Sequence, residues 1–352
     1  FIALRILDSR VRGNDGFEDA TSIRYIVKST YMITLKSAQL ENIPTLLYLW
    51  NVTLGNDFPL TEKLLRQTME SDPYYESDGH LIAWKGKTAV GWVLCKSMKN
   101  AGAEVGRFAG RGSIGALCVH PNYQRQSIGT QLLKAAENHL QNNGSPLTLL
   151  YYPHHLLPGV PVQQKSALAF FEKHGYSFEK ECVDMMRDLR DYHIPPKVLI
   201  ALEKNPTVEI RPAYINETKQ IIDMVSEEFP GGWTYSTKGH FARGQKASDF
   251  IVAAEDSRVI GFCHTADFNS PWLIANTYWF PLLGENYGGL GPLGIAKAHR
   301  KRGLGLAIVA LAVEDLKKRG VQRMCIVWTT LTDFYGKLGF EVWKRYRQGM
   351  KE

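Results

Sequence analysis

A basic turn with two glycines is the part of the sequence best suited to bind an anion. It follows a strand-like stretch that ends near His299, and it opens a helix with apolar residues at Val309, Val313 and Leu316. N–H groups in the first turn of a helix have no partner within the helix and lie at the positive end of its dipole, so they can bind phosphate oxygens. Glycines let the main chain approach a pyrophosphate closely, and basic side chains add positive charge. The residues of this turn are Arg300, Lys301, Arg302, Gly303, Leu304, Gly305 and Leu306.

A second motif, Phe-Tyr-Gly-Lys-Leu-Gly-Phe, lies about 30 residues later, at residues 334–340. The order of strand, Arg-x-x-Gly-x-Gly, helix and this aromatic motif resembles the GCN5-related N-acetyltransferases (GNAT). The resemblance covers essentially Met32 to the C-terminus, as two copies. It implies an acetyl-CoA-dependent N-acetyltransferase that moves an acetyl group to a primary amine of a small molecule. The transfer would be a direct attack in a ternary complex, with no covalent enzyme intermediate.

The resemblance also implies roles for particular residues of the second copy. The turn from Lys301 to Leu306 would hold the CoA pyrophosphate. The strand before it would separate from its neighbour, so that the main chain of Ile295, Ala296 and Lys297 could bond the pantetheine amides. Tyr335 would lie near the thioester sulfur, where a tyrosine hydroxyl can protonate the departing thiolate. We therefore predict Tyr335 as the general acid.

The acceptor amine must also lose a proton, and the sequence leaves open which residue takes it. The family often uses a glutamate on the central strand or an ordered water, but residues 290–296 contain no carboxylate. Asp267, after the predicted hairpin, and Glu285, before the central strand, are candidates, with His264 behind them.

The first copy keeps the outline of the turn at residues 119–130 but departs from the pattern in two places. Ser127 stands where the first glycine of the turn is expected, and Phe171 stands where the second copy has Tyr335. A phenyl ring cannot donate a proton. Our hypothesis is therefore that this copy binds CoA but is catalytically silent, serving as scaffold or as part of the acceptor pocket. Its predicted cofactor-binding residues are Val119, Gln124, Arg125, Gln126, Ser127, Ile128, Gly129 and Thr130.

The segment at residues 227–235, Glu-Glu-Phe-Pro-Gly-Gly-Trp-Thr-Tyr, mixes carboxylates with aromatic rings. It can be a capped turn with buried rings. In the family this loop helps to form the acceptor site, so Glu228 and Trp233, together with Asp267, are predicted substrate-binding residues. Carboxylates beside aromatic rings suit a cationic amine or an amino sugar. The chain as a whole resembles tandem bacterial acetyltransferases that act on amino sugars or cysteine-linked glycosides, so a glucosamine-like acceptor is the first expectation.

The elements that must position these residues occur twice in the same order. Each copy reads as a strand, helices, a β-hairpin, a strand, the turn with its helix, another strand and a short helix. Met32 to Gln124 and Val208 to Arg300 both span 92 positions, which predicts tandem domains. We expect two mixed α/β GNAT-type domains, each a mostly antiparallel twisted sheet flanked by helices. The expected ranges are a poorly ordered leader (1–31), the first domain (32–190), a linker (191–206) and the second domain (207–352).

Composition agrees with a folded two-domain protein. The 352 residues are 44% hydrophobic and 22% charged, with a formal net charge of +7, all within the range of globular proteins. No stretch reaches the roughly 18 apolar residues of a membrane helix, and the first 30 residues lack the apolar core of a secretion signal. We therefore expect no membrane partner. The five cysteines are far apart and mostly lie in apolar runs, which predicts reduced thiols and a cytoplasmic location.

Other functions fit the sequence less well. Residues 289–294 satisfy a Gly-x-Gly-x-x-Gly pattern but precede a strand instead of opening a helix, unlike a dinucleotide site. No metal site is expected, because His154 and His155 are adjacent and no Cys-x-x-Cys occurs. Basic clusters at 299–302 and 317–319 lie at opposite ends of one helix without interleaved aromatic residues, so nucleic acid is not the expected partner. The competing interpretation is a non-catalytic CoA-binding or nucleic-acid-binding regulatory protein.

Overall fold

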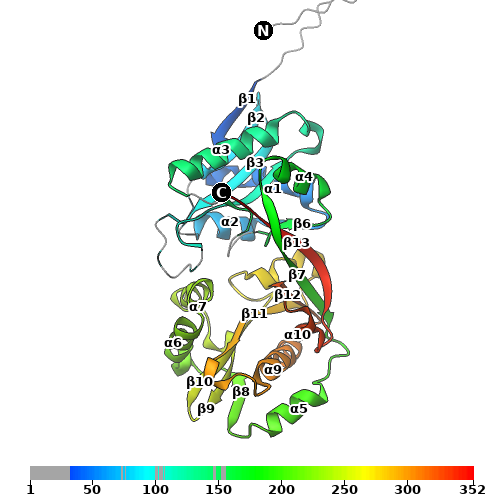
Figure 1. Ribbon diagram of the computed structural model, residues 1–352. Coiled ribbons are helices and arrows are strands. Elements are labelled where there is room, and N and C mark those ends of the chain that lie inside the picture. The colour runs from blue at the N-terminus through cyan, green and yellow to red at the C-terminus, as the bar shows by residue number, and fades with distance from the viewer. Residues whose placement is uncertain are drawn as a thin grey trace, which may run out of the picture. The chain divides into compact units, whose positions relative to one another are not determined.

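The computed structural model describes residues 32–352, apart from positions 73, 76, 100, 101, 103–105, 107, 146, 147 and 152–155. The predicted leader at 1–31 and the pair His154–His155 therefore lie outside the described residues. Residues 33–352 form one unit, and within it thirteen strands make a single sheet (Figure 1). Among the described strands only two neighbouring pairs, β4 with β5 and β11 with β12, run parallel. The prediction of a mixed, mostly antiparallel sheet is confirmed.

The elements of the first half follow the predicted order. They are β1 (Ile33–Ser37), η1 (Leu40–Asn42), α1 (Ile43–Leu54), α2 (Glu62–Glu70), η2 (Ser77–Gly79), β2 (His80–Lys85), β3 (Thr88–Ser97), β4 (Gly112–Val119), η4 (Pro121–Tyr123), α3 (Ile128–Asn142), β5 (Thr148–Leu149), β6 (Val160–Pro161), α4 (Lys165–Lys173) and β7 (Ser177–Asp188). Helix α5 (Pro196–Glu203) lies within the predicted linker.

The second half repeats this order and adds a helix. Its elements are β8 (Val208–Pro212), η5 (Ile215–Glu217), α6 (Thr218–Glu228), α7 (Gly232–Ala242), η6 (Ala247–Asp249), β9 (Phe250–Glu255), β10 (Arg258–Asp267), η7 (Ala275–Thr277), α8 (Phe280–Leu283), β11 (Tyr287–Ile295), η8 (Lys297–His299), α9 (Leu304–Lys318), β12 (Arg323–Thr329), α10 (Thr332–Gly336) and β13 (Glu341–Lys351).

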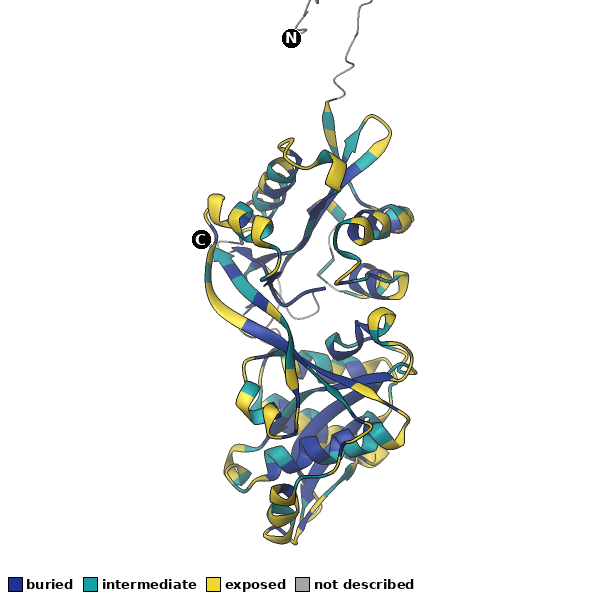
Figure 2. Ribbon diagram, turned by 90° about the vertical axis from the view of Figure 1, so that its right-hand side faces the viewer, coloured by how far each residue is buried: buried dark blue, intermediate teal, exposed yellow. Residues whose placement is uncertain are grey.

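Helices cover both faces of the sheet because alternate strand residues point to opposite sides. In β9, Ile251 and Ala253 belong to the core under α9, whereas Phe250 and Val252 pack in the core that includes α6. Figure 2 shows the outcome, with buried strands between helices that each expose one face. The sequence predicted α9 from its apolar spacing, and the residues that form its buried stripe include Ala307, Ile308, Val309, Ala312, Val313 and Leu316.

The two halves exchange their last strands. Strand order is β5-β13-β7-β12, so β13 of the second half lies beside β5 of the first, and β7 of the first lies beside β12 of the second. The register pairs Met350 with Leu149 and Cys325 with Met186. In Figure 1 the two strands cross between the halves. The halves also share a core, in which the Phe58 ring lies 5.4 Å from that of Trp279. The division into a first domain (32–190), a linker (191–206) and a second domain (207–352) stays a prediction.

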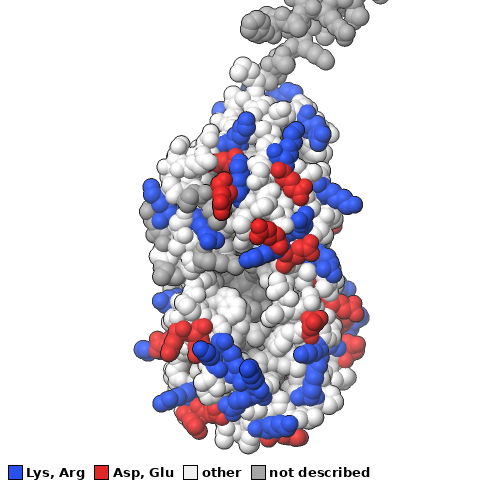
Figure 3. Space-filling model, viewed as in Figure 1, with Lys and Arg blue, Asp and Glu red and all other residues white. Residues whose placement is uncertain are grey.

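Two further features bear on the expectations from composition. Across the described part of the chain, no helix combines the length and apolarity required to cross a bilayer. All five cysteines are buried, and none of them forms a disulfide in the described structure. On the face shown in Figure 3, positive and negative side chains are intermixed over both halves.

Candidate active site

The basic turn before α9 has the main-chain shape that phosphate binding requires. Lys301 and Gly303 have φ values of +65° and +82°, and the helix begins at Leu304. Alternating positive φ values turn successive N–H groups toward one concave side, as in anion-binding loops. Gly303 is needed for two reasons, since it has a positive φ and a Cβ there would lie 2.8 Å from the Cβ of Ala201.

The three cations of this turn have different surroundings. Arg302 donates to Asn205 Oδ1 (2.8 Å) and pairs with Glu255 (2.8 Å), and this pairing lowers the pKa of Glu255 to about 2. Arg300 donates to the Ile295 carbonyl (2.8 Å) and lies 3.4 Å from Glu228. Lys301 is exposed and has no partner among the described residues. Two of the predicted phosphate-binding cations thus brace the turn, and Lys301 is available to an anion.

The predicted pantetheine-binding groups near the end of β11 are already bonded within the chain. Arg300 donates to Ile295 O, Ala296 N–H donates to Ile260 O (2.8 Å), and Lys297 N–H donates to the Glu228 carboxylate (2.8 Å). Glu228 therefore lies at the turn and not among the residues that line the cavity described below. The main-chain groups of β11 that face an open space lie earlier in the strand.

An opening separates β11 from β12. The two strands pair in parallel only from Tyr287 with Arg323 to Gly289 with Cys325. Beyond that point β11 continues to pair with β10 on its other side, and β12 pairs with β7. No pairing between β11 and β12 follows Gly289 in the described residues, so the facing edges of the two strands are not paired with each other there. A separation of this strand from its neighbour was predicted, and it begins after Gly289, well before the predicted pantetheine-binding residues Ile295–Lys297.

A cavity of about 850 Å³ occupies this opening and extends beyond it. Its walls include residues 290–293 of β11 and 326–329 of β12, together with Tyr335 and Trp233. Such a volume is typical of a site for a small molecule. The cavity thus joins these facing strand edges to the two residues that the sequence predicted for the acid and the acceptor.

Tyr335 lies in α10 and is 7% exposed. Burial raises the pKa of its hydroxyl well above the usual value, with a smaller contribution from Cys263. Within the described part of the chain no residue hydrogen-bonds this hydroxyl. The phenol is therefore protonated at neutral pH, and its proton is available to a molecule in the cavity.

One of the three candidate bases lines the cavity. His264 does, and its ring stacks on that of Phe250 at 4.5 Å. Burial, and then the charges of nearby basic groups, lower its pKa well below the usual value, so the imidazole is neutral. Asp267 pairs with Arg319 (3.2 Å) and does not line the cavity, and Glu285 is exposed.

Trp233 reaches the cavity from helix α7, which begins earlier than the sequence predicted. The segment interpreted as a turn contains the start of α7, which begins at Gly232 after Gly231 with a φ of +115°. Trp233 is 42% exposed, and its ring lies 5.1 Å from that of Phe229. The start of this helix was missed because Pro-Gly-Gly normally ends regular structure.

The first half contributes a wall that sequence reasoning missed. Gln67, Ser71 and Asp72, at and after the end of α2, line the cavity. Asp72 is the one carboxylate among the described lining residues, and it forms an ion pair with Lys96, which is fully buried. A lysine within the apolar run of β3 was the available signal, because a buried cation requires a partner.

The turn of the first half repeats that of the second. Arg125 and Ser127 have φ values of +60° and +62°, and α3 begins at Ile128. Gln124 donates to Val119 O (3.0 Å), at the same spacing as Arg300 to Ile295 O. Serine thus adopts the left-handed conformation that glycine adopts in the second half.

The residue at the acid position differs between the halves. Phe171 is buried in the first-half core, with its ring 5.3 Å from that of Tyr176. The first half therefore has the turn without the hydroxyl.

Comparisons with known proteins agree with this duplication. The acetyltransferase (GNAT) family matches residues 46–176 and 218–340. Among curated proteins, no sequence matches the chain.

Three solved structures resemble the chain. A fungal multi-domain GH3 β-N-acetylglucosaminidase has a region described as a GCN5-related glucosamine N-acetyltransferase, with 27% identity, a TM-score of 0.79 and 92% of this chain covered. The match covers 38% of the fungal chain. An N-acetyltransferase from Sphaerobacter thermophilus has 16% identity and a TM-score of 0.65, with 91% of this chain and 95% of that chain covered. A tandem GNAT protein of the clavulanic acid pathway has 14% identity and a TM-score of 0.63, with 91% and 98% covered.

The last two similarities concern the fold alone, whereas the family match extends over both halves. Each matched segment contains one of the turns, and each ends immediately before an exchanged strand, β7 or β13. The chain therefore belongs to the acetyltransferase (GNAT) family, with two copies of the family's fold.

Proposed function

We propose that the protein transfers an acetyl group from acetyl-CoA to the primary amine of a small molecule, at the cavity of the second half. The observation that carries the proposal is the position of Tyr335. Tyr335 lines the same cavity as residues 290–293 of β11 and 326–329 of β12, and no described residue hydrogen-bonds its hydroxyl. An amine, a thioester and a proton donor can therefore meet in one cavity.

Acetyl-CoA fits the second half on two grounds. The turn at Lys301–Leu306 combines positive φ values, a helix N-terminus and an unpaired lysine, which suits a pyrophosphate. The opening between β11 and β12 can accept the extended pantetheine arm of CoA between the edges of the two strands. When bound, acetyl-CoA supplies an activated acyl carbonyl. The residues of the chain would bind the acceptor and provide the proton donor and the proton acceptor.

The proposed chemistry needs one proton donor and one proton acceptor. The amine nitrogen forms a bond to the acyl carbon, the C–S bond breaks, and Tyr335 gives its proton to the sulfur. The proton lost by the amine goes to His264, directly or through water, since this is the candidate base that lines the cavity. A neutral imidazole can accept a proton, although its low pKa makes it a weak base.

An amino sugar is the acceptor class that we propose. Aromatic side chains, including Trp233, Trp272 and Trp328, line the cavity together with the carboxylate of Asp72. Flat apolar rings suit the C–H face of a sugar, and a carboxylate suits its ammonium or hydroxyl groups. The fungal region described as a glucosamine N-acetyltransferase, at 27% identity, supports the same class.

For the first half we propose a CoA-binding turn without catalysis. The φ values at Arg125 and Ser127 support the binding, and Phe171 at the place of Tyr335 supports the lack of an acid. The first half also takes part in the acceptor site through Asp72 and Gln67. A cytoplasmic location remains part of the proposal, on the five buried free thiols.

The alternative is a regulatory protein that binds CoA or nucleic acid without turnover. The basic clusters argue against a nucleic acid, because most of their members already have partners. Arg300 and Arg302 contact glutamates, Arg319 contacts Asp267, and Lys317 donates to Tyr192 O (2.8 Å). Nucleic-acid binding would appear as a steeply salt-dependent affinity for a polynucleotide.

A thiol-release assay tests the proposal. Wild type and Tyr335→Phe are incubated with acetyl-CoA and a panel of amino sugars, polyamines, amino acids and aminoglycosides. Turnover with amino sugars that falls about 10²- to 10⁴-fold in Tyr335→Phe supports both the reaction and the acid. Phe171→Ala is the matched control and should leave turnover intact. Tight CoA binding without turnover on any amine would favour the alternative.

A further inference from the structure

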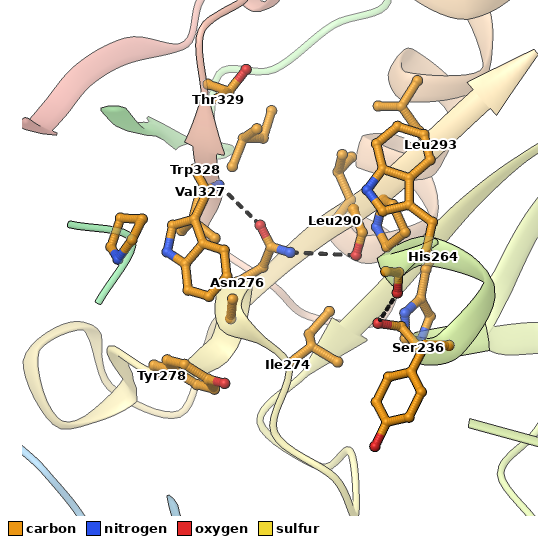
Figure 4. Close-up of a pocket in the computed structure, with 18 of the residues that line it drawn as sticks. Ser236, His264, Ile274, Asn276, Tyr278, Leu290, Leu293, Val327, Trp328 and Thr329 are labelled. Atoms are coloured by element: carbon orange, nitrogen blue, oxygen red, sulfur yellow. Dashed lines mark hydrogen bonds between the residues drawn. The ribbon is translucent and has the colours of Figure 1, made fainter. Parts of the chain in front are cut away.

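The side chain of Asn276 spans the opening between β11 and β12 (Figure 4). Its Oδ1 accepts the N–H of Val327 on β12 (3.0 Å), and its Nδ2 donates to the carbonyl of Gly291 on β11 (3.4 Å). The last direct pair between the strands, Gly289 with Cys325, lies two residues earlier on each strand. The amide of Asn276 therefore takes the place of the next rung of the ladder.

The surroundings hold Asn276 in this position. It is 6% exposed and lies in η7, in the connection from β10 to β11. The hydroxyl of Tyr287 donates to its carbonyl oxygen. Gly289 gives it room, because a Cβ at that position would overlap the Cβ of Asn276. The residue is thus fixed by side-chain and main-chain bonds at once.

This bridge limits the space available to an extended arm between the strands. Gly291 O and Val327 N–H each lie two residues beyond the last strand pair, and Asn276 already forms a hydrogen bond with both. An arm that enters from the turn before α9 can bond only to groups nearer the open end. Asn276, Trp328 and Tyr335 all line the cavity. The thioester end of the arm would therefore stop against the amide of Asn276.

We propose that Asn276 is a positioning and specificity-determining residue, whose amide closes the narrow end of this opening, sets the depth to which an acyl-CoA enters and restricts the acyl group to a small one. The inference rests on the proposed function. Asn276 would position the acyl donor, whereas Asp72 and Trp233 would contact the acceptor.

Binding measurements distinguish an effect on the pantetheine arm of CoA from an effect on its pyrophosphate. Affinities of CoA and ADP are measured by calorimetry on wild type, Asn276→Ala and Asn276→Asp. ADP carries the pyrophosphate without the pantetheine arm, so its affinity should not change. The affinity for CoA should fall about tenfold in Asn276→Ala, because the opening loses its bridge and its defined end.

Steady-state kinetics give a second readout. In Asn276→Ala the KM for acetyl-CoA should rise while the KM of the acceptor stays the same, and the ratio of kcat/KM for butyryl-CoA to that for acetyl-CoA should increase about tenfold. Asn276→Asp keeps the size of the side chain and the bond from Val327 but cannot donate to Gly291. It should bind CoA more weakly and still prefer the acetyl group.

Tyr287→Phe is the graded comparison. It removes one of the bonds that hold Asn276 but neither bond of the bridge, so it should change the CoA to ADP affinity ratio and the acyl preference less than Asn276→Ala does. Equal losses for CoA and ADP in Asn276→Ala, or unchanged CoA affinity and acyl preference in that variant, would overturn the inference. If wild type itself neither binds CoA nor acetylates an amine, the proposed function fails instead.

Discussion

The side-chain amide of Gln67 forms two hydrogen bonds with the main chain of Leu273, 206 residues further along the chain. Gln67 Nε2 donates to Leu273 O (2.7 Å), and Leu273 N–H donates to Gln67 Oε1 (3.0 Å). Gln67 belongs to the first half, and Leu273 lies in the connection that contains Asn276. Both residues line the cavity. The first half thus holds a wall of the second half's site in place.

Gln67→Ala should therefore affect the acceptor more than the donor. Loss of both bonds releases the connection at Leu273, and net hydrogen bonds of this kind contribute about 1 kcal/mol each. We expect the acceptor KM to rise several-fold, as measured by thiol release, with a smaller rise in the KM for acetyl-CoA because Asn276 lies in the same connection.

The control for this variant is Arg66→Ala on the same helix. Arg66 is exposed and pairs with Glu62 and Glu70 within α2. Its removal should leave both KM values unchanged. Equal acceptor KM values in the two variants would show that the contact does not shape the site.

Exchanging serine and glycine between the two turns tests how much the left-handed backbone conformation at this position costs. Ser127 and Gly303 occupy equivalent places with φ values of +62° and +82°. Ser127→Gly should raise the free energy of unfolding by about 1 kcal/mol, because glycine adopts this conformation without steric cost. Gly303→Ser should lower it by a similar or larger amount, since its Cβ would lie 2.8 Å from that of Ala201.

The same pair of variants reports on cofactor binding. Gly303→Ser should weaken CoA binding and acetyl transfer together, whereas Ser127→Gly should leave turnover unchanged. Calorimetry of CoA on both variants provides the check. A loss of turnover in Ser127→Gly would contradict the assignment of catalysis to the second half.

Breaking the buried ion pair of Lys96 and Asp72 should cause a large loss of stability, and a second substitution should restore most of it. Lys96 is fully buried, and burial lowers its pKa, while Asp72 provides its counter-charge. Asp72→Asn leaves a buried cation without its partner, which should cost about 3–5 kcal/mol in denaturant unfolding.

The double variant Asp72→Asn with Lys96→Met separates folding from acceptor binding. It removes both charges, so most of the lost stability should return. The acceptor KM should stay high, because the carboxylate that lines the cavity is still missing. Recovery of both properties would mean that Asp72 serves the fold alone.

The sequence predicted the turns and their helices well, because Arg300–Leu306 combines local signals that need no tertiary context. It did not predict the exchange of β7 and β13, since either strand satisfies the same apolar pattern beside its own half or the other half. The first-half wall and Asn276 were also missed. Gln67 and Asn276 act through contacts with residues far away or on neighbouring strands, and no periodicity in the sequence marks such contacts.

The carboxyl group of Asp184, on the exchanged strand β7, should make the stability of the protein depend on pH. It is fully buried, accepts the hydroxyl of Tyr346 (2.7 Å) and the N–H of Trp328 (3.2 Å), and so joins β7 to β13 and β12. Burial raises its pKa to about 6, against the opposing effect of these hydrogen bonds. The carboxyl group is therefore easier to deprotonate in the unfolded chain than in the folded one.

The sign of the pH dependence follows from this difference. The folded protein binds more protons than the unfolded chain between the two pKa values, so stability falls as pH rises through this window. The full contribution is present below pH 4, and about 3 kcal/mol is lost by pH 7. Asp184→Asn cannot ionise and should lack this loss. Urea unfolding of both proteins between pH 4 and pH 7 should give curves whose difference grows with pH in favour of the variant, and parallel curves would show that Asp184 does not carry the dependence.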